Sequence, residues 1–181
     1  MGTSATELSD IRIPPSFCEY AAGPCDQKFL GMLPSQAIFL FGQQPQEISS
    51  TIEAAVEKLR TMMSMKRWIS WKNLDVPGQI IFCEICKAMR FSEMVVADVT
   101  TLNFNLMFEI GCAIGLGLPV LPIRNARFVE DKHQFDELGI LDTLGYLDFQ
   151  TSNDIKDHLI ANPNRARLAA NVPALNNESP L

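Results

Sequence analysis

Short apolar runs alternate along the chain with longer segments that have helical periodicity. The runs at 36–41, 94–97 and 120–123 are typical of buried strands, because each is brief and bounded by Gly, Pro or polar residues. Two further strands are predicted at 67–71 and 146–149. Apolar residues recur with helical spacing between these strands, which predicts helices at 48–59, 78–90, 105–116 and 152–160.

This alternation predicts an α/β fold, since parallel strands need crossover connections, usually helices. We expect a flavodoxin-like, doubly wound, five-stranded parallel sheet with the strand order 2-1-3-4-5. In that order the topological switch point lies between the first and third strands, and ligands bind beyond the carboxyl ends of these two strands. The corresponding loops are 41–44 and 98–103. Polar residues of both loops are therefore expected to face one crevice.

The predicted strands and helices lie between residues 35 and 161, which we interpret as one folded domain. Residues 1–34 contain Gly, Pro and polar clusters without a clear period, and predict an N-terminal tail and an irregular cap. Residues 162–181, with three prolines among Asn, Ala and Ser, are typical of a linker. A linker-like segment of this kind would suit attachment to a further domain.

The formal net charge of -6 and the sequence pI of about 4.9 argue against a surface that binds polymeric nucleic acid. The apolar stretch 104–123 has the length of a membrane span, but Gly115, Gly117 and Pro119 divide it into a helix and a strand. Five cysteines without a secretory signal pattern predict a cytoplasmic protein with reduced thiols. We therefore expect neither a membrane nor a nucleic acid as partner.

Cys83 and Cys86 form a CxxC pair that could hold zinc together with Cys18 and Cys25. The spacing of Cys18 and Cys25 is unusual for a zinc site, and the CxxC pair lies inside a predicted helix. Packing of two small apolar side chains is the favoured interpretation. No metal ion and no cofactor is expected.

Glu109 is the one charged residue between Asp98 and Arg124. Burying a carboxylate among apolar residues without a partner is unfavourable, so such a residue frequently serves chemistry. Asn105 precedes Glu109 by one helical turn and can line the same wall. With Asp98 and Asn103, these residues mark the junction between an apolar strand and an apolar helix. The alternative is an ordinary solvated helix position for Glu109.

The segment 95–120 has the pattern VVADVTxxNxNxxxEIGxAxGxGxPV, where x is any residue. It resembles the signature of the nucleoside 2-deoxyribosyltransferase-like superfamily. In that family the helix glutamate attacks the anomeric carbon of a sugar, and the aspartate and asparagines before it hold sugar or base. The resemblance implies Glu109 as the nucleophile, with Asp98, Asn103 and Asn105 as its companions, and makes 35–161 a catalytic domain.

Two residues depart from the family pattern. Phe104 stands where a helix-starting proline is common, and Cys112 stands where an aromatic residue is frequent. Neither change affects the carboxylate, but Cys112 weakens the expectation of base stacking at that position. Trp71 and Tyr146 are other aromatic residues that could stack on a base, with core or rim packing as the alternative for each.

In some members of the family a Tyr-x-Ala-Gly-Pro loop ends the first strand, and residues 20–24 resemble it. The loop of Phe41, Gly42 and Gln43 is favoured here, because a good helix follows it directly. We expect these three residues to contact the substrate.

An N-glycosidic bond breaks through a transition state with positive charge on the sugar, so a carboxylate below the anomeric carbon stabilises that charge and can trap it covalently. A second group must protonate or hydrogen-bond the departing base, and Asp98 is favoured over Glu84. The alternative for Asp98 is an Asx turn or helix cap that holds the loop 99–104. Either Asn103 or Asn105 is expected to cap the following helix.

We expect an N-glycosidase that acts on a nucleoside, a nucleotide or an NAD-like metabolite. The residues leave open whether water or a second base is the acceptor, and hence whether the enzyme is a hydrolase or a transferase. The family resemblance, with the linker-like C-terminal segment, also suggests an effector of antiviral defence. The alternatives are a non-catalytic nucleotide-sensing module and a Toll/interleukin-receptor-type NAD hydrolase, which also uses a helix glutamate.

Apolar surface is expected to remain on Phe104, Phe108 and Leu116, and on the N-terminal segment around 29–32. Large apolar patches usually mark an interface, and we predict a homo-oligomer with two-fold symmetry. The alternative is that residues 13–34 fold back and cover the patch within one subunit.

Overall fold

The computed structural model describes residues 36–43, 45–64, 66–74, 81–101, 103–128 and 145–162. The strands in these ranges are β1 (Gln36–Leu40), β2 (Arg67–Ser70), β3 (Met94–Asp98), β4 (Val120–Asn125) and β5 (Leu147–Phe149). The helices are α1 (Gln46–Met62), α2 (Ile81–Arg90), α3 (Phe104–Gly115) and α6 (Ser152–Ala161), with the short 3-10 turn η4 (Trp71–Asn73). The predictions for the tail 1–34 and for the linker after residue 162 lie outside the described residues, as do those for Cys18 and Cys25.

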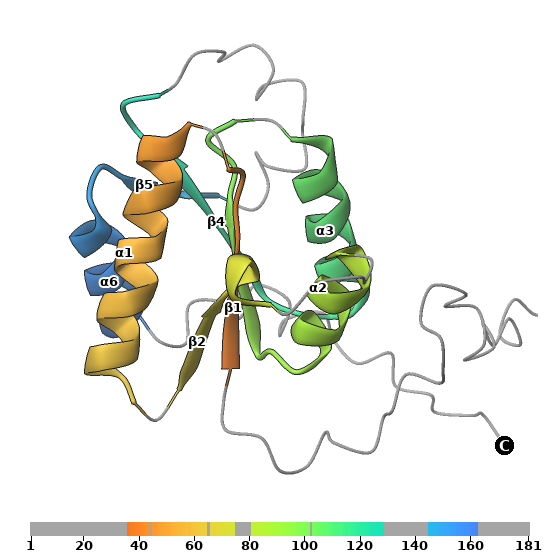
Figure 1. Cartoon of the computed structure of the whole chain (residues 1–181). Coiled ribbons are helices and arrows are strands. Elements are labelled where there is room, and N and C mark those ends of the chain that lie inside the picture. Colours follow the sequence, from red (N-terminus) through yellow and green to blue (C-terminus); the bar gives the residue numbers. More distant parts are fainter. Residues whose placement is uncertain are drawn as a thin grey trace, which may run out of the picture.

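The strands form one parallel sheet of five, in the order β2-β1-β3-β4-β5. The predicted flavodoxin-like α/β fold is therefore confirmed. Helices α1 and α6 cover one face of the sheet, and α2 and α3 cover the other (Figure 1). Because β1 and β3 are direct neighbours, the loops that follow them lie side by side at the switch point.

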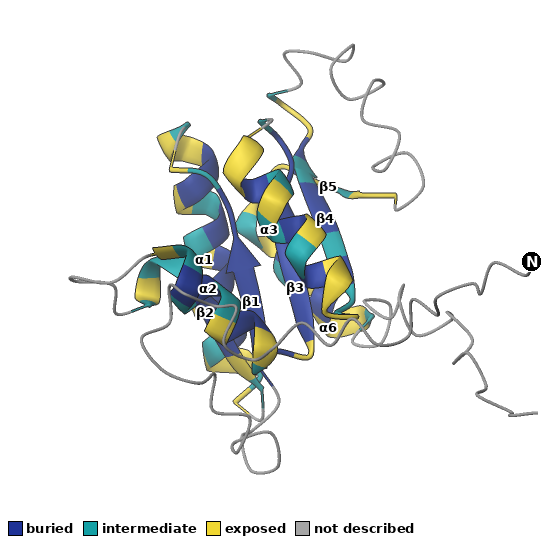
Figure 2. Cartoon of the chain, turned by 90° about the vertical axis from the view of Figure 1, so that its right-hand side faces the viewer, coloured by how far each residue is buried: buried dark blue, intermediate teal, exposed yellow. Residues whose placement is uncertain are grey.

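Side chains of the central strands alternate between two apolar clusters, one on each face of the sheet. On β1, Phe39 joins the cluster against α1 and α6, whereas Ile38 and Leu40 join the cluster against α2 and α3. Every residue of β1 and β3 is buried, as the dark blue strands of Figure 2 show. Burial on both faces explains why these two strands have nearly continuous apolar sequences.

Strand β2 ends one residue earlier than the sequence alternation predicts. The Ser70 hydroxyl accepts a hydrogen bond from the Lys72 N–H at 3.2 Å, and Asn73 Oδ1 accepts one from the Ser70 N–H at 3.4 Å. This reciprocal cap turns the chain into η4 and sends the Trp71 side chain toward the end of β1. Local hydrogen bonding of polar side chains overrides the strand period here.

The apolar stretch after β3 is divided as the sequence predicts. Helix α3 ends at Gly115, and Gly117 follows with a φ of 72°, a left-handed conformation that favours glycine. Pro119 then leads into β4. Within the described ranges, no helix has both the length and the apolar character needed to cross a membrane.

Candidate active site

A pocket of about 440 Å³ opens where the loops after β1 and β3 meet the first turns of α2 and α3. Its walls are Phe41, Gln43, Trp71, Ile81, Ile85, Asn103, Asn105, Leu106 and Glu109. The volume is in the usual range of small-molecule sites, ~300–1,000 Å³. The pocket therefore lies where the topology predicts a ligand, beyond the carboxyl ends of the two central strands.

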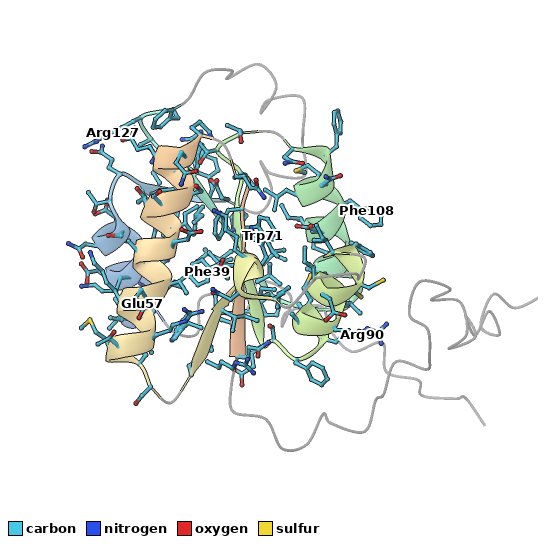
Figure 3. All side chains as sticks on the ribbon, in the orientation of Figure 1. Phe39, Glu57, Trp71, Arg90, Phe108 and Arg127 are labelled. Atoms are coloured by element: carbon cyan, nitrogen blue, oxygen red, sulfur yellow. The ribbon has the colours of Figure 1, made fainter. Side chains whose placement is uncertain are left out.

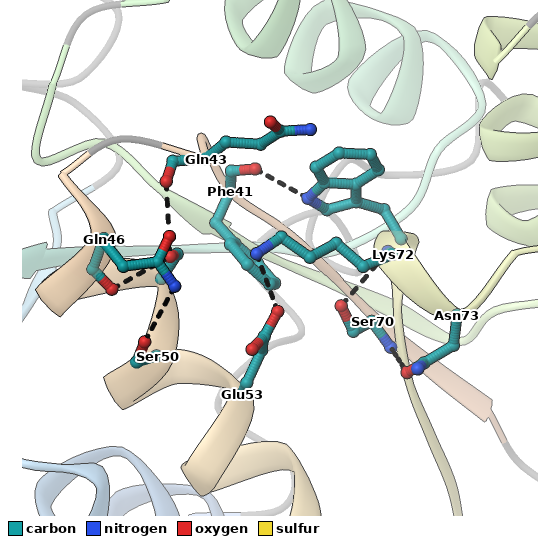
Figure 4. A network of polar contacts seen from close by, with 10 residues as sticks. Phe41, Gln43, Gln46, Ser50, Glu53, Ser70, Lys72 and Asn73 are labelled. Atoms are coloured by element: carbon teal, nitrogen blue, oxygen red, sulfur yellow. Dashed lines mark hydrogen bonds and ion pairs between the residues drawn. The ribbon is translucent and has the colours of Figure 1, made fainter.

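The wall on the β1 side is held in place by η4 and α1. The indole N–H of Trp71 donates to the Phe41 carbonyl at 2.7 Å, and the two rings meet edge to face with centroids 6.2 Å apart. The Ser49 hydroxyl lies 3.4 Å from the Gln43 carbonyl, which it can donate to. Figure 4 shows these contacts together with the ion pair of Lys72 and Glu53, which are 2.7 Å apart. The backbone of Phe41 and Gln43 is thus fixed without using the Gln43 amide.

The wall on the β3 side is the first turn of α3. Asn103 is the N-cap of this helix, because its Oδ1 accepts from the Asn105 N–H at 2.9 Å. This resolves which of the two asparagines caps the helix. The Asn105 amide makes no hydrogen bond to any described residue, and both side chains are exposed at the pocket.

Glu109 lies one turn further along α3, half-buried against the apolar wall of the pocket. Burial raises the pKa of its carboxyl to about 7. Across the described part of the chain, no hydrogen bond or ion pair to its carboxylate offsets this desolvation. Its neighbours Phe104 and Phe108 are instead 94% and 63% exposed. On this helix the carboxylate faces the pocket while two aromatic rings face solvent, the reverse of the usual arrangement.

Asp98 ends β3 and is only 4% exposed. Its carboxylate accepts from the Thr100 N–H at 3.1 Å and from the Thr100 hydroxyl, which itself accepts from the Asn125 N–H at 2.8 Å. Burial raises the pKa of Asp98 to about 6 and outweighs the two hydrogen bonds from Thr100, which lower it. The contacts form the Asx-type turn that the sequence offered as an alternative, and they tie the ends of β3 and β4 together.

Five of the seven residues predicted for the site line one pocket: Phe41, Gln43, Asn103, Asn105 and Glu109. Gly42 and Asp98 are not among its lining residues. Trp71 does line it, whereas the Tyr146 ring packs on the Arg124 guanidinium, 3.8 Å from the ring centroid.

Sequence reasoning missed the pocket wall formed by α2. Ile81 and Ile85 line the pocket one helical turn apart, and Leu106 joins them from α3. The i, i+4 spacing of the two isoleucines signals a shared helix face, but not that this face borders a cavity. Glu84, on the same helix, is ion-paired with Lys87 at 2.5 Å and does not line the pocket.

The described residues contain no group of three or more His, Cys, Asp or Glu side chains that could hold a metal ion. Cys83 is buried on α2 and Cys86 is half-buried. Cys86 packs against the apolar cluster on that face of the sheet, as expected for a packing residue.

Comparisons with known proteins bear on the fold. No protein-family model and no curated protein sequence matches the chain. Among solved structures, a conserved protein from Enterococcus faecalis V583 aligns with a TM-score of 0.50 at 14% identity, over 71% of this chain and 99% of that chain. The CMP N-glycosidase BcmB from Clostridium botulinum aligns with a TM-score of 0.48 at 15% identity, over 69% and 98%. The TIR domain of the Toll-related receptor TRR-2 from Hydra magnipapillata aligns with a TM-score of 0.49 at 19% identity, over 70% and 93%. At 14% identity, the alignment with the Enterococcus faecalis protein supports the α/β fold and not an activity.

Proposed function

We propose that this domain is an N-glycosidase that cleaves the bond between base and sugar in a nucleoside, a nucleotide or an NAD-like metabolite, with Glu109 as the nucleophile. The observation that carries the proposal is the placement of the Glu109 carboxylate. It lies in a ligand-sized pocket, partly desolvated, with no bond to another described residue. Perturbed carboxylates of this kind concentrate at functional sites.

In the proposed reaction, Glu109 is the nucleophile in a substitution at the anomeric carbon. As the C1′–N bond breaks, the base leaves with the bonding electron pair and positive charge develops on the sugar. The carboxylate stabilises this charge and then forms a C1′–O bond, giving a glycosyl ester. Water or a second base then attacks C1′, the C1′–O bond to Glu109 breaks, and the carboxylate is released. The attacking group loses its proton to solvent, from which a base that departed as an anion takes one. The apolar walls strengthen the electrostatic part of this stabilisation by lowering the local dielectric.

The remaining wall residues suit the two halves of such a substrate. Trp71, Ile81 and Ile85 offer an apolar and aromatic surface for a planar base. The Asn105 and Gln43 amides, whose side chains bond to no other described residue, can hydrogen-bond sugar hydroxyls or the departing base.

For Asp98 the geometry favours a positioning role over the direct proton donation expected from the sequence. It is buried and does not line the pocket. Through Thr100 it holds the chain that leads to Asn103 and α3.

Chromatography of a substrate panel tests the function directly. The domain is incubated with nucleosides, nucleotides and NAD⁺, and free base is quantified by reverse-phase separation. Release of a base supports the proposal, and a sugar product or a transferred base then distinguishes hydrolase from transferase. An intact panel with measurable binding would point to the nucleotide-sensing module instead. The defence role and the cytoplasmic location remain predictions from the sequence.

A further inference from the structure

The residues that line the pocket carry one negative charge and no positive charge, which is unusual for a site expected to hold nucleotides. Of its nine lining residues, Glu109 alone carries a charge. The three segments 36–57, 73–86 and 98–123 supply every lining residue except Trp71, and their sequences contain no Lys, Arg or His. The same segments do contain several acids, so the part of the chain that carries these lining residues is neutral to negative.

Lys72 is a cationic residue directly next in the chain to a lining residue, Trp71. Its ammonium group is paired with the Glu53 carboxylate at 2.7 Å and lies 5.3 Å from the centroid of the Phe41 ring (Figure 4). The Phe41 ring belongs to the apolar cluster against α1, whereas the pocket lies on the α3 side of the sheet. Lys72 is thus paired with Glu53 and is not among the residues that line the pocket.

Helix N-termini are the other places where a phosphate group is commonly held. At α3, the Asn103 side chain already accepts the Asn105 N–H. At α1, the N–H groups of Ile48 and Ser49 donate to the Pro45 carbonyl, and Glu47 places a negative charge in the first turn. Neither of these helix ends combines free N–H groups with a described cation, as phosphate sites usually do. The first turn of α2, which also meets the pocket, carries the acidic Glu84, and its basic residues lie in the last turn.

We propose that this pocket selects a nucleoside without a phosphate group and discriminates against 5′-monophosphates and dinucleotides. The inference rests on the proposed function and narrows its substrate class. A phosphate would bring up to two negative charges near the Glu109 carboxylate, and no described residue that lines the pocket carries a positive charge to neutralise them. Their repulsion is strong in a partly desolvated site. A neutral nucleoside avoids this repulsion. One with a cationic base, such as nicotinamide riboside, is attracted by the same carboxylate.

Matched pairs of substrates test the selection. Adenosine, cytidine, guanosine, uridine and nicotinamide riboside are each compared with the corresponding 5′-monophosphate, and NAD⁺ is included. For any base that is released, we expect kcat/KM of the nucleoside to exceed that of its monophosphate by at least about 100-fold. Equal or faster cleavage of the monophosphate or of NAD⁺ would overturn the inference.

A second experiment adds a positive charge at the rim of the pocket. Gln43→Lys should reduce the preference for the nucleoside over its monophosphate by about tenfold or more, because it provides the missing cation. The matched control is Ala54→Lys on the exposed side of α1, outside the pocket, which adds the same charge and should leave the ratio unchanged. Equal ratios in the two variants would show that charge at the pocket does not set the preference.

A binding measurement distinguishes a failure of this inference from a failure of the proposed function. If the wild-type domain releases no base from any compound, the glycosidase proposal fails, and calorimetric titration with the same pairs then tests the selection alone. Tighter binding of the nucleosides would keep the inference. Equal or tighter binding of the monophosphates, or no binding of either, would overturn it.

Discussion

Glu109 is surrounded differently from Glu84, the other acidic residue of α2 and α3. Glu84 is compensated by Lys87 in an ion pair, whereas no described residue bonds to the Glu109 carboxylate. Its sequence neighbours gave the signal for this difference, because no charge stands between Asp98 and Arg124 except its own. The sequence could predict an uncompensated carboxylate, but its partial exposure to a pocket required the three-dimensional structure.

The pH dependence of kcat/KM tests the ionisation of Glu109. Burial raises its pKa to about 7, and only the carboxylate form can attack the anomeric carbon. We therefore expect kcat/KM to decrease about tenfold per pH unit as the pH falls below about 7. A profile that stays flat from about pH 5 to about pH 8 would contradict a nucleophilic Glu109. A decline above about pH 6 would instead indicate that the proton of Asp98 is needed, because its pKa is about 6.

Substitution of Asp98 separates positioning from proton transfer. Asp98→Asn keeps an oxygen that can accept from the Thr100 N–H and hydroxyl, so we expect kcat/KM to stay within about tenfold of wild type. Asp98→Ala leaves both Thr100 donors without this acceptor and should lower the free energy of unfolding by about 1–3 kcal/mol. Urea unfolding and initial rates measure the two effects. A loss of about 1,000-fold in Asp98→Asn, with the fold intact, would show that the carboxyl itself takes part in the chemistry.

At the scale of elements, the junctions between strands and helices were the hardest part to predict. The sequence named two possible caps for α3, and the structure selects Asn103 because only its side chain accepts an N–H of the first turn. At β2 the alternation favoured a strand through Trp71, but the cap formed by Ser70 and Asn73 ends it. Hydrogen bonds of this kind depend on side-chain rotamers, which the apolar period does not encode.

The turn η4 supports the loop after β1, and Trp71 tests that support. Trp71→Phe retains an aromatic ring in the pocket but loses the N–H that donates to the Phe41 carbonyl. We expect a decrease of about 1 kcal/mol in the free energy of unfolding, and KM to rise about three- to tenfold with a smaller change in kcat. Trp71→Leu, which also removes the ring, should raise KM further. Wild-type KM in both variants would show that Trp71 serves packing alone.

At the scale of the whole molecule, the order of strands followed from the sequence because each strand is a compact apolar run and each helix has a clear period. The sequence predicted the residues that line the pocket less completely than the order of the strands. Ile81 and Ile85 look like ordinary core residues, and Asp98 looks like a site residue although its carboxylate turns back to Thr100. Whether an apolar or a polar side chain borders a cavity is set by how helices pack, which no local pattern specifies.

Association of the domain is predicted from the outer surface of α3. Phe108 lies on the side of α3 away from the sheet (Figure 3), and its ring packs on Phe82 with centroids 4.9 Å apart. Phe104 and Ile81 are further exposed apolar residues of the same two helices, and Ile81 also lines the pocket. Exposed aromatic clusters usually mark interfaces. We predict a two-fold homo-oligomer through this surface.

Light scattering at micromolar concentration measures this association. Wild type should have at least twice the mass of one chain, and Phe108→Asp should shift the equilibrium toward the monomer. Ala54→Asp is a matched control, because it adds the same charge to the exposed side of α1. A single-chain mass for wild type at all concentrations would rule the interface out.

The most direct test is base release by Glu109→Gln, measured on the substrate that the wild type cleaves fastest. Glutamine retains the size and polarity of the side chain but cannot attack the anomeric carbon, so kcat/KM should fall by at least about 1,000-fold, or about 4 kcal/mol of transition-state stabilisation. Glu84→Gln is the matched control, since it neutralises a carboxylate outside the pocket and should leave turnover within about threefold of wild type. Folding of both variants is checked by circular dichroism. A folded Glu109→Gln variant with wild-type turnover would contradict the assignment of Glu109 as the nucleophile.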